Sequence, residues 1–207
     1  MNTRVNSIVR PAVTLFLIMT VLLGVVYPFA VTGLSQLLFH DQAAGSLVVV
    51  NGKAVGSRII GQSFSEPKYF WSRPSATAPQ PYNAIASSGS NLGPLNPALT
   101  DAVGTRIAAL KADDPTNMLP VPVDLVTASA SGLDPDISIA AARYQAARVA
   151  RIRGLDPAAV RSLIDAHARG KLFGLVGEPR VNVLELNLAL DALSIPNKQG
   201  TAGSPGA

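Results

Sequence analysis

The chain has 207 residues, enough for one ordinary domain and an additional segment. Hydrophobic residues make up 48% of it and charged residues only 14%, a charged share that is low for a soluble domain. The formal net charge is +4, without the clustering of Lys and Arg that a nucleic-acid surface needs, so we expect no nucleic-acid partner. The absence of cysteine excludes disulfides and fits either side of a membrane.

The apolar excess lies near the N-terminus. Residues 11–39 carry no charged side chain, and Val13–Leu34 would span roughly 33 Å as a helix, about the thickness of a bilayer's hydrocarbon core. We therefore predict a transmembrane helix over residues 12–38. A cleaved signal peptide is the alternative, but its apolar core is usually only about 7–15 residues, and residues 27–29 (Tyr-Pro-Phe) make a poor cleavage site.

The flanking charges predict the orientation of this helix. Arg4 and Arg10 precede it, whereas no Lys or Arg follows it until Lys53. Because basic flanks tend to stay in the cytoplasm, we predict a short cytoplasmic N-terminus over residues 1–11. Residues 39–195 are then expected to form a single extracytoplasmic domain.

This domain is expected to begin with a β-hairpin over residues 46–61. Two β-branched runs flank Asn51-Gly52, the dipeptide favoured in two-residue type I′ turns. The following stretch, residues 69–97, is unusual because 15 of its 29 residues are Ser, Pro, Asn or Gly, yet it also holds four aromatic residues. Disordered linkers avoid so much aromatic surface, so we predict an ordered loop.

Four helices are predicted after this loop, which gives an α+β domain. The first covers residues 100–114, with Thr100 or Asp101 as its cap. The second runs from Asp134-Pro135, a capping carboxylate followed by proline, to about Arg153. Between them, residues 118–132 look extended, and their prolines confine them to a sheet edge or a path outside any sheet.

The last two helices carry similar start signals. Asp156-Pro157 opens the third helix, and Gly170 is expected to stop it. Asn182, with Glu185 three residues later, resembles a capping box for the fourth. Residues 196–207, rich in Gly, Ser and Pro, are predicted to form a disordered tail.

Candidates for catalysis are few. His40 lies at the predicted membrane edge, and His167 lies on the apolar face of a predicted helix, where a packed role is commoner than a catalytic one. A hydrolase using Ser88 or Ser90 would therefore lack a base, and two histidines without cysteine make a zinc site improbable. We predict no catalytic residues, no metal site and no enzymatic activity of the chain on its own. Gln145 stands in an apolar helix stripe and, if buried, needs hydrogen-bond partners from a neighbouring loop or a ligand.

Four motifs together resemble one family. They are "GQSFSEPKYFWSRPSA", "YNAIASSGSNLGPLNP", "VPVDLVTASASGLDPDIS" and "KLFGLVGEPRVNVLELNLALD". The chain is similar, over nearly its whole length, to the C subunit (KdpC) of the Kdp potassium-transporting P-type ATPase. Ser72 and Ser88 stand where the family commonly has glycine, a small departure.

The resemblance implies an accessory subunit in the bacterial plasma (inner) membrane. Its partners would be a pore-forming (A), an ATPase (B) and a small single-helix (F) subunit, which together import K⁺ at the expense of ATP. The chain has no D-K-T-G-T phosphorylation motif, and a single spanning helix cannot enclose an ion path. We therefore expect it to serve assembly and activity, with its domain on the outer face of the pore subunit.

A second role implied by the resemblance is nucleotide binding. The family is often described as a catalytic chaperone that raises the ATP affinity of the ATPase subunit, and the glutamine credited with this matches Gln145 in "DISIAAARYQ". ATP is thus implied by the resemblance alone. The predicted topology places Gln145 outside the membrane, where ATP is scarce, so this role is kept as the alternative.

Residues 69–97 are also the predicted docking surface for a partner subunit. The alternative is that the stretch packs only for the stability of its own domain. The docking candidates are Tyr69, Phe70, Trp71, Arg73, Tyr82, Asn83 and Asn91.

Overall fold

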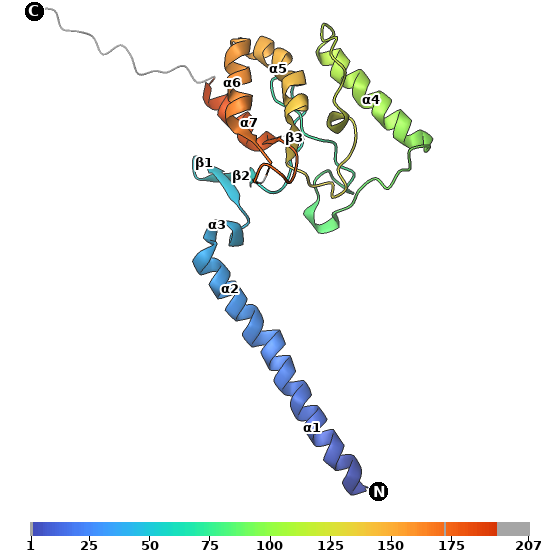
Figure 1. Cartoon of the computed structure of the whole chain (residues 1–207), viewed down its shortest axis with the longest axis vertical. Coiled ribbons are helices and arrows are strands. Elements are labelled where there is room, and N and C mark those ends of the chain that lie inside the picture. The colour runs from blue at the N-terminus through green and yellow to red at the C-terminus, as the bar shows by residue number, and fades with distance from the viewer. Residues whose placement is uncertain (1, 172, 194–207) are drawn as a thin grey trace, which may run out of the picture. The chain divides into compact units, whose positions relative to one another are not determined.

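The computed structural model describes residues 2–171 and 173–193 (Figure 1). They fall into two units, one ending at Leu47 and the other beginning at Val48. The described residues combine helices with a two-stranded and a three-stranded sheet, which confirms the α+β class. The predicted tail, residues 196–207, lies outside the described residues.

The first unit is almost entirely helical. Its elements are α1 (Asn2–Val21), a π-helical turn η1 (Leu22–Val26), α2 (Tyr27–Leu38) and the short α3 (His40–Ala43). Pro28 explains the π turn, since it has no amide hydrogen to donate to the carbonyl of Gly24 and the hydrogen-bond ladder must shift. The part from Ile8 to Leu38 is long and apolar enough to cross a membrane, judged by length and composition.

The second unit begins with the predicted hairpin. Its strands are β1 (Leu47–Val50) and β2 (Lys53–Ser57). Asn51 and Gly52 have φ values of +51° and +76°, as a type I′ turn requires. From β2 to α4 (Pro97–Asp113) the chain is loop, except for the 3₁₀ turn η2 (Ala84–Ala86).

A small antiparallel sheet organises the C-terminal half. Its strands, in the order β3–β5–β4, are β3 (Asp136–Ser138), β5 (Arg180–Asn182) and β4 (Ala168–Arg169). Ile137 of β3 and Ala168 of β4 both lie opposite Val181. Because Ile137 and Val181 are buried, the central strand β5 fixes the sheet to the core.

The predicted helix start at Asp134 is wrong. Residues 136–138 form β3, and α5 covers Ile139–Arg153. The Asp134 carboxylate accepts a hydrogen bond from the amide of Asp136, two residues on, and so shapes a turn instead of capping a helix. Ser138 is the true cap, since its hydroxyl accepts from the amide of Ala141. Burial of Ile137 in the sheet overrides the Asp-Pro start signal.

Two further helix boundaries differ from the prediction. α4 is capped by Asn96 and not by Thr100 or Asp101, because the Asn96 side chain accepts from the Ala98 amide (3.0 Å) ahead of Pro97. α6 (Pro157–His167) ends three residues before Gly170, because Ala168–Arg169 pair with β5. Tertiary pairing therefore ends this helix earlier than its glycine would.

The remaining start signals are confirmed. Asp156 caps α6 by accepting from the Ala158 amide, and Asn182 caps α7 (Val183–Leu193) by accepting from the Glu185 amide. Residues 118–132 follow a path outside any sheet, with one 3₁₀ turn, η3 (Val123–Leu125).

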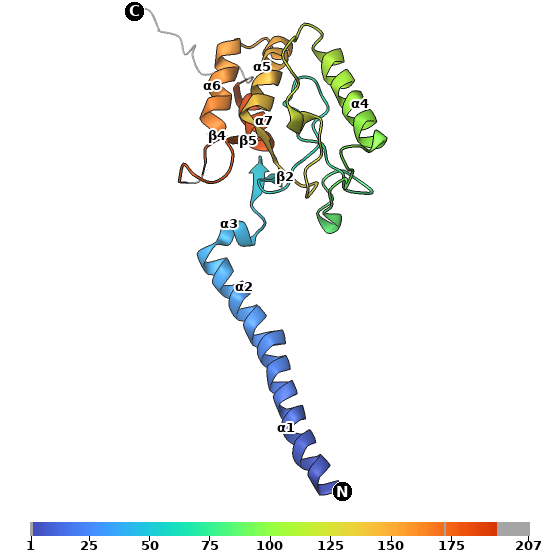
Figure 2. The same cartoon turned by 45° about the vertical axis from the view of Figure 1, so that its right-hand side comes forward.

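Helices α5, α6 and α7 pack around the sheet, whereas loop segments separate them from α4 (Figures 1 and 2). The core side chains include Ile137, Val149, Val160, Ile164, Val181, Leu186 and Leu190.

Candidate functional site

Two side-chain amides bind the backbone of two consecutive residues in the loop of residues 69–97. Asn187, on α7, accepts a hydrogen bond from the Phe70 amide (2.9 Å) and donates to the Phe70 carbonyl (3.0 Å). Gln145, on α5, accepts from the Trp71 amide (2.7 Å) and donates to the Trp71 carbonyl (3.2 Å). Only 2% of Asn187 and 1% of Gln145 are exposed. Each side-chain amide therefore supplies the two backbone hydrogen bonds that a neighbouring strand would supply in a sheet, although Phe70 and Trp71 belong to no sheet.

The side chain of Phe70 explains why these amides are needed. Its ring is fully buried in the core, so the backbone beside it loses contact with water. A buried amide or carbonyl without a partner costs about 1–3 kcal/mol. The helices supply the missing partners through polar residues at otherwise apolar positions, such as Asn187, which shares a helix face with the buried Val183 and Leu190.

Arg148 holds the same segment from a third point. Its buried guanidinium donates to the carbonyls of Pro67 and Tyr69 and to Oε1 of Gln145 (2.8 Å). It also lies over the ring of Trp71, 4.8 Å from the centroid. Burial lowers the pKa of Arg148, and the oxygens around it stabilise its charged form.

Arg153 and Asp191 add a fourth attachment. Arg153 donates to the carbonyl of Lys68 (2.8 Å), pairs with Asp191 (2.7 Å) and lies 4.7 Å from the centroid of the Tyr69 ring. The Tyr69 hydroxyl donates to the same carboxylate (3.1 Å). We call residues 66–77 the clamped segment, since side chains of α5 and α7 bind its backbone at every position from Pro67 to Trp71.

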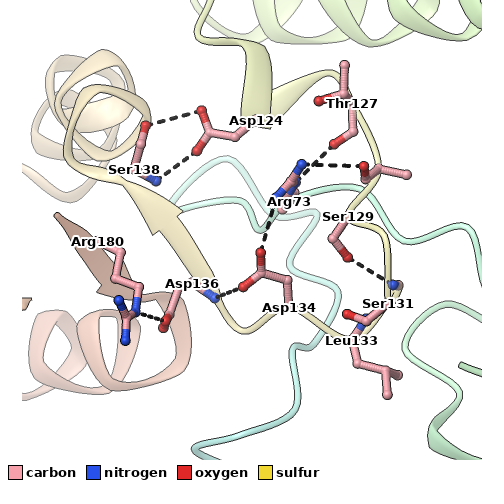
Figure 3. A network of polar contacts seen from close by, with 12 residues as sticks. Arg73, Asp124, Thr127, Ser129, Ser131, Leu133, Asp134, Asp136, Ser138 and Arg180 are labelled. Atoms are coloured by element: carbon pink, nitrogen blue, oxygen red, sulfur yellow. Dashed lines mark hydrogen bonds and ion pairs between the residues drawn. The ribbon is translucent and has the colours of Figure 1, made fainter. Parts of the chain in front are cut away.

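Arg73, in the second half of the clamped segment, connects it to the loop before β3 (Figure 3). Its guanidinium donates to the carbonyls of Thr127 (3.3 Å) and Ala128 (3.4 Å) and pairs with Asp134 (3.2 Å). Asp134 in turn accepts from the amide of Asp136. The carboxylate predicted to cap a helix therefore fixes two loops to each other.

A cleft of about 530 Å³ lies beside this network. Asp124 in its wall accepts from both the amide (2.7 Å) and the hydroxyl (3.1 Å) of Ser138, and Asp136 pairs with Arg180 (2.8 Å), as Figure 3 shows. Across residues 2–171 and 173–193, no group of three or more His, Cys, Asp or Glu side chains is placed to hold a metal ion. The carboxylates of this wall are engaged within the domain.

The predicted docking residues differ in how much surface they present. Phe70 presents none, because its side chain lies in the core, and five others are half-buried against their own domain: Tyr69, Trp71, Arg73, Tyr82 and Asn83. The Tyr82 hydroxyl donates to the Arg73 carbonyl, and burial raises the pKa of Tyr82. Asn91 is the exposed member of the set.

Gln145 has partners on both ends of its amide. Its nitrogen donates to the carbonyls of Trp71 and Ala141, and its oxygen accepts from Trp71 and Arg148. Of the two sources of partners considered from the sequence, a neighbouring loop or a ligand, the structure shows the loop. Its nucleotide role stays a prediction, and a nucleotide would have to displace one of these partners.

Sequence reasoning missed the most exposed apolar side chains of the stretch. Ile85 is 98% exposed and Leu95 is 96% exposed. The loop that carries them is anchored by Asn83, which accepts from the Ile85 amide, and by the α4 cap Asn96. We call residues 83–96 the exposed segment. Isolated aliphatic residues between Ser, Gly and Pro gave no pattern from which their exposure could be predicted.

The comparisons with known proteins agree on one family. The family model described as KdpC, K⁺-transporting ATPase c chain, matches residues 9–192. A potassium-transporting ATPase KdpC subunit from Variovorax paradoxus (strain S110) is 67% identical over 187 residues, which cover 90% of this chain and 97% of the relative. KdpC subunits from Herminiimonas arsenicoxydans (64%, covering 90% and 98%) and Polaromonas naphthalenivorans (strain CJ2; 64%, covering 94% and 100%) are similarly close.

Proposed function

Because the chain belongs to the KdpC family of K⁺-transporting ATPase c chains, we propose that it is an accessory, non-catalytic subunit of an ATP-driven, high-affinity K⁺ import complex. In this proposal the phosphorylation site is on the ATPase (B) subunit and the ion path in the pore-forming (A) subunit. The chain and the small single-helix (F) subunit complete the complex, and the chain serves its assembly and activity.

The proposal includes a membrane anchor. The apolar helix from Ile8 to Leu38 would cross the plasma membrane once, with Arg10 on the cytoplasmic side and the domain outside. Since the chain has no cysteine, one introduced at the exposed Ser162 would be the only thiol of the purified chain that a membrane-impermeant maleimide could have labelled. We expect labelling in intact spheroplasts; labelling only after lysis would contradict this orientation.

Docking on the outer face of the pore subunit is proposed to occur through the exposed segment. The observation that carries this is that Ile85 and Leu95 are almost fully exposed, yet the loop between them is fixed to the domain. The Ser87 hydroxyl and the Ser88 amide both donate to the Ser131 carbonyl (3.0 Å each). Apolar side chains on a fixed loop suit an interface, because little conformational entropy is lost when they are covered.

Site-specific photo-crosslinking in the assembled complex tests this docking. A photoreactive residue at Ile85 or Leu95 should crosslink to the pore subunit, whereas one at the exposed Arg161 on α6 serves as the control. Equal crosslinking from all three positions, or none from Ile85 and Leu95, would overturn the proposal.

The alternative, nucleotide binding near Gln145, has a matched control in Asn187. The two amides make equivalent contacts to adjacent residues, so Gln145→Ala and Asn187→Ala should disturb the clamped segment alike. If Gln145 binds nucleotide, only Gln145→Ala will raise the KM of the complex for ATP. Equal effects of both variants on assembly, without a change in that KM, would leave Gln145 a purely structural role.

A further inference from the structure

The loop after β4 exposes three large apolar side chains close together. Phe173 is 89% exposed, Leu175 is 83% exposed and Val176 is 65% exposed. Phe173 and the glycines at 174 and 177 all have positive φ values, so the chain turns sharply there. None of the three side chains belongs to the hydrophobic core of the described residues. Such a group is costly to leave in water unless something covers it.

The charges around this loop favour an anionic surface as its partner. Arg58, Arg169, Lys171 and Arg180 leave 41–49% of their side chains exposed. The carboxylates that pair with the three arginines, Glu185 and Asp136, are only 25% and 17% exposed. Glu178 is the exposed acid beside them. In each of these ion pairs the arginine is more exposed than the carboxylate, so the pairs present a mainly positive surface to solvent.

The loop between β4 and β5 also begins close to the N-terminal hairpin of the domain. Glu185 pairs with both Arg169 of β4 (2.6 Å) and Arg58 (3.2 Å), the residue directly after β2. In a two-residue hairpin the end of β2 lies beside the start of β1, which is the entry point of the second unit. Both views place the loop between β4 and β5 at this hairpin end of the domain (Figures 1 and 2).

The covalent connection limits how far this end can lie from the apolar helix. Residues 39–47 join Leu38 to Val48, and nine residues reach at most roughly 30 Å when fully extended. An apolar group with basic neighbours, within that reach of a bilayer, matches the chemistry of interfacial membrane contacts.

We propose that Phe173, Leu175 and Val176 insert into the interfacial region of an anionic lipid bilayer, with the neighbouring basic side chains at the headgroups. The chain then touches the membrane twice, through its spanning helix and through this loop. The inference needs the proposed membrane anchor but not the proposed docking of the exposed segment.

Fluorescence quenching in lipid vesicles tests this contact on the full-length chain. Because the chain has no cysteine, a single cysteine at Leu175 or at Met118 can carry an environment-sensitive dye. Met118 is a matched control, since it is also apolar and 91% exposed but lies in the loop after α4. The vesicles contain phosphatidylcholine with or without phosphatidylglycerol, and doxyl-labelled lipid as the quencher.

We expect quenching at position 175 to exceed that at position 118 by about threefold or more, because interfacial insertion reaches the acyl-chain boundary. The difference should shrink without phosphatidylglycerol and in the Lys171→Glu variant, because both changes weaken the attraction between headgroups and basic side chains. Equal quenching at both positions would overturn the proposal. So would a dye at 175 that is shielded only when the pore subunit is present and is never quenched by the lipid, since the loop would then bind protein.

Discussion

The clamped segment and the exposed segment belong to one stretch of similar composition, yet they meet the domain in opposite ways. In the clamped segment, the backbone of Phe70 and Trp71 is bound by side chains from two helices. In the exposed segment, Asn83 and Asn96 bind amides only two residues away, and the long-range bonds of Ser87 and Ser88 to the Ser131 carbonyl leave Ile85 and Leu95 uncovered. The difference teaches that buried side-chain partners from the helices, and not local composition, decide which part of a loop becomes core and which part stays available to a partner protein.

The largest expected effect comes from removing one amide of the clamp. Gln145→Ala leaves both the amide and the carbonyl of Trp71 without their buried partner and removes an acceptor from Arg148. We expect the free energy of unfolding to fall by about 4 kcal/mol, since each unpaired buried group costs about 1–3 kcal/mol. Chemical denaturation of the full-length chain in detergent, followed by circular dichroism, measures this loss.

Two further variants control that experiment. Asn187→Ala should cost about 3 kcal/mol, because Asn187 makes the equivalent contacts to Phe70 but gives no acceptor to Arg148. Gln80→Ala removes an exposed amide just beyond the clamped segment and should change the unfolding free energy by less than about 0.5 kcal/mol. A loss in Gln145→Ala no larger than that in Gln80→Ala would show that water replaces the missing amide.

The next effect is expected at Gly132, in the loop before β3, which packs against both segments. Gly132 has a φ of +67°, and a Cβ there would lie 2.5 Å from the Thr77 methyl and 2.7 Å from the Ser88 carbonyl oxygen. Gly132→Ala therefore combines an unfavourable backbone conformation with a backbone clash. We expect a loss of about 2–3 kcal/mol, measured by the same denaturation experiment.

Gly93→Ala is the matched control in the exposed segment. Gly93 has no positive φ, and a Cβ there would meet nothing within 4 Å. This variant should leave the unfolding free energy unchanged within about 0.5 kcal/mol. Equal losses in the two glycine variants would show that the close approach of Gly132 to the two segments does not contribute to stability.

Much of the fold could be predicted because its signals are local. The Asn-Gly hairpin and the caps Asp156 and Asn182 depend on residues within a few positions of one another. Two of the three wrong helix boundaries share one cause, which is pairing with distant residues: β5 converts residues 136–138 into a strand and ends α6 before Gly170. The third, the start of α4 at Asn96-Pro97, was a local signal that sequence reasoning overlooked.

The candidate site was less predictable than the fold. The need of Gln145 for partners could be read from its apolar surroundings, but its contact with Trp71, 74 positions away, could not. The same pattern in α7, where Asn187 shares a helix face with Val183 and Leu190, was a usable signal that sequence reasoning overlooked. The inward orientation of Phe70 depends on the complete core and has no local signature.

A smaller effect is expected from Tyr82, which lies between the two segments. Burial raises its pKa, so above about pH 10 the unfolded chain ionises this phenol before the folded chain does. Its stabilising contribution is complete below the unfolded pKa and is lost as pH rises through the folded pKa. Tyr82→Phe should cost about 1 kcal/mol at neutral pH, through the lost hydrogen bond to the Arg73 carbonyl, and should reduce the alkaline loss of stability.

Denaturation midpoints between pH 7 and pH 11 check this prediction. Part of the alkaline loss should remain in Tyr82→Phe, because burial also raises the pKa of Tyr144. An identical pH dependence in the original chain and the variant would show that Tyr82 does not contribute to it.

The smallest effect on stability is expected in the exposed segment. Because this segment is proposed to dock on a partner, substitutions there should instead affect assembly of the complex. Ile85→Ser and Leu95→Ser remove side chains that contact almost nothing in their own domain, so the unfolding free energy should change by less than about 0.5 kcal/mol. If the exposed segment docks on the pore subunit, the same variants should lower the yield of assembled complex in an affinity purification through that subunit, because each removes apolar surface from the interface. The reverse pattern, lower stability with normal assembly, would show that these side chains serve their own domain, and the proposed docking surface would have to lie elsewhere.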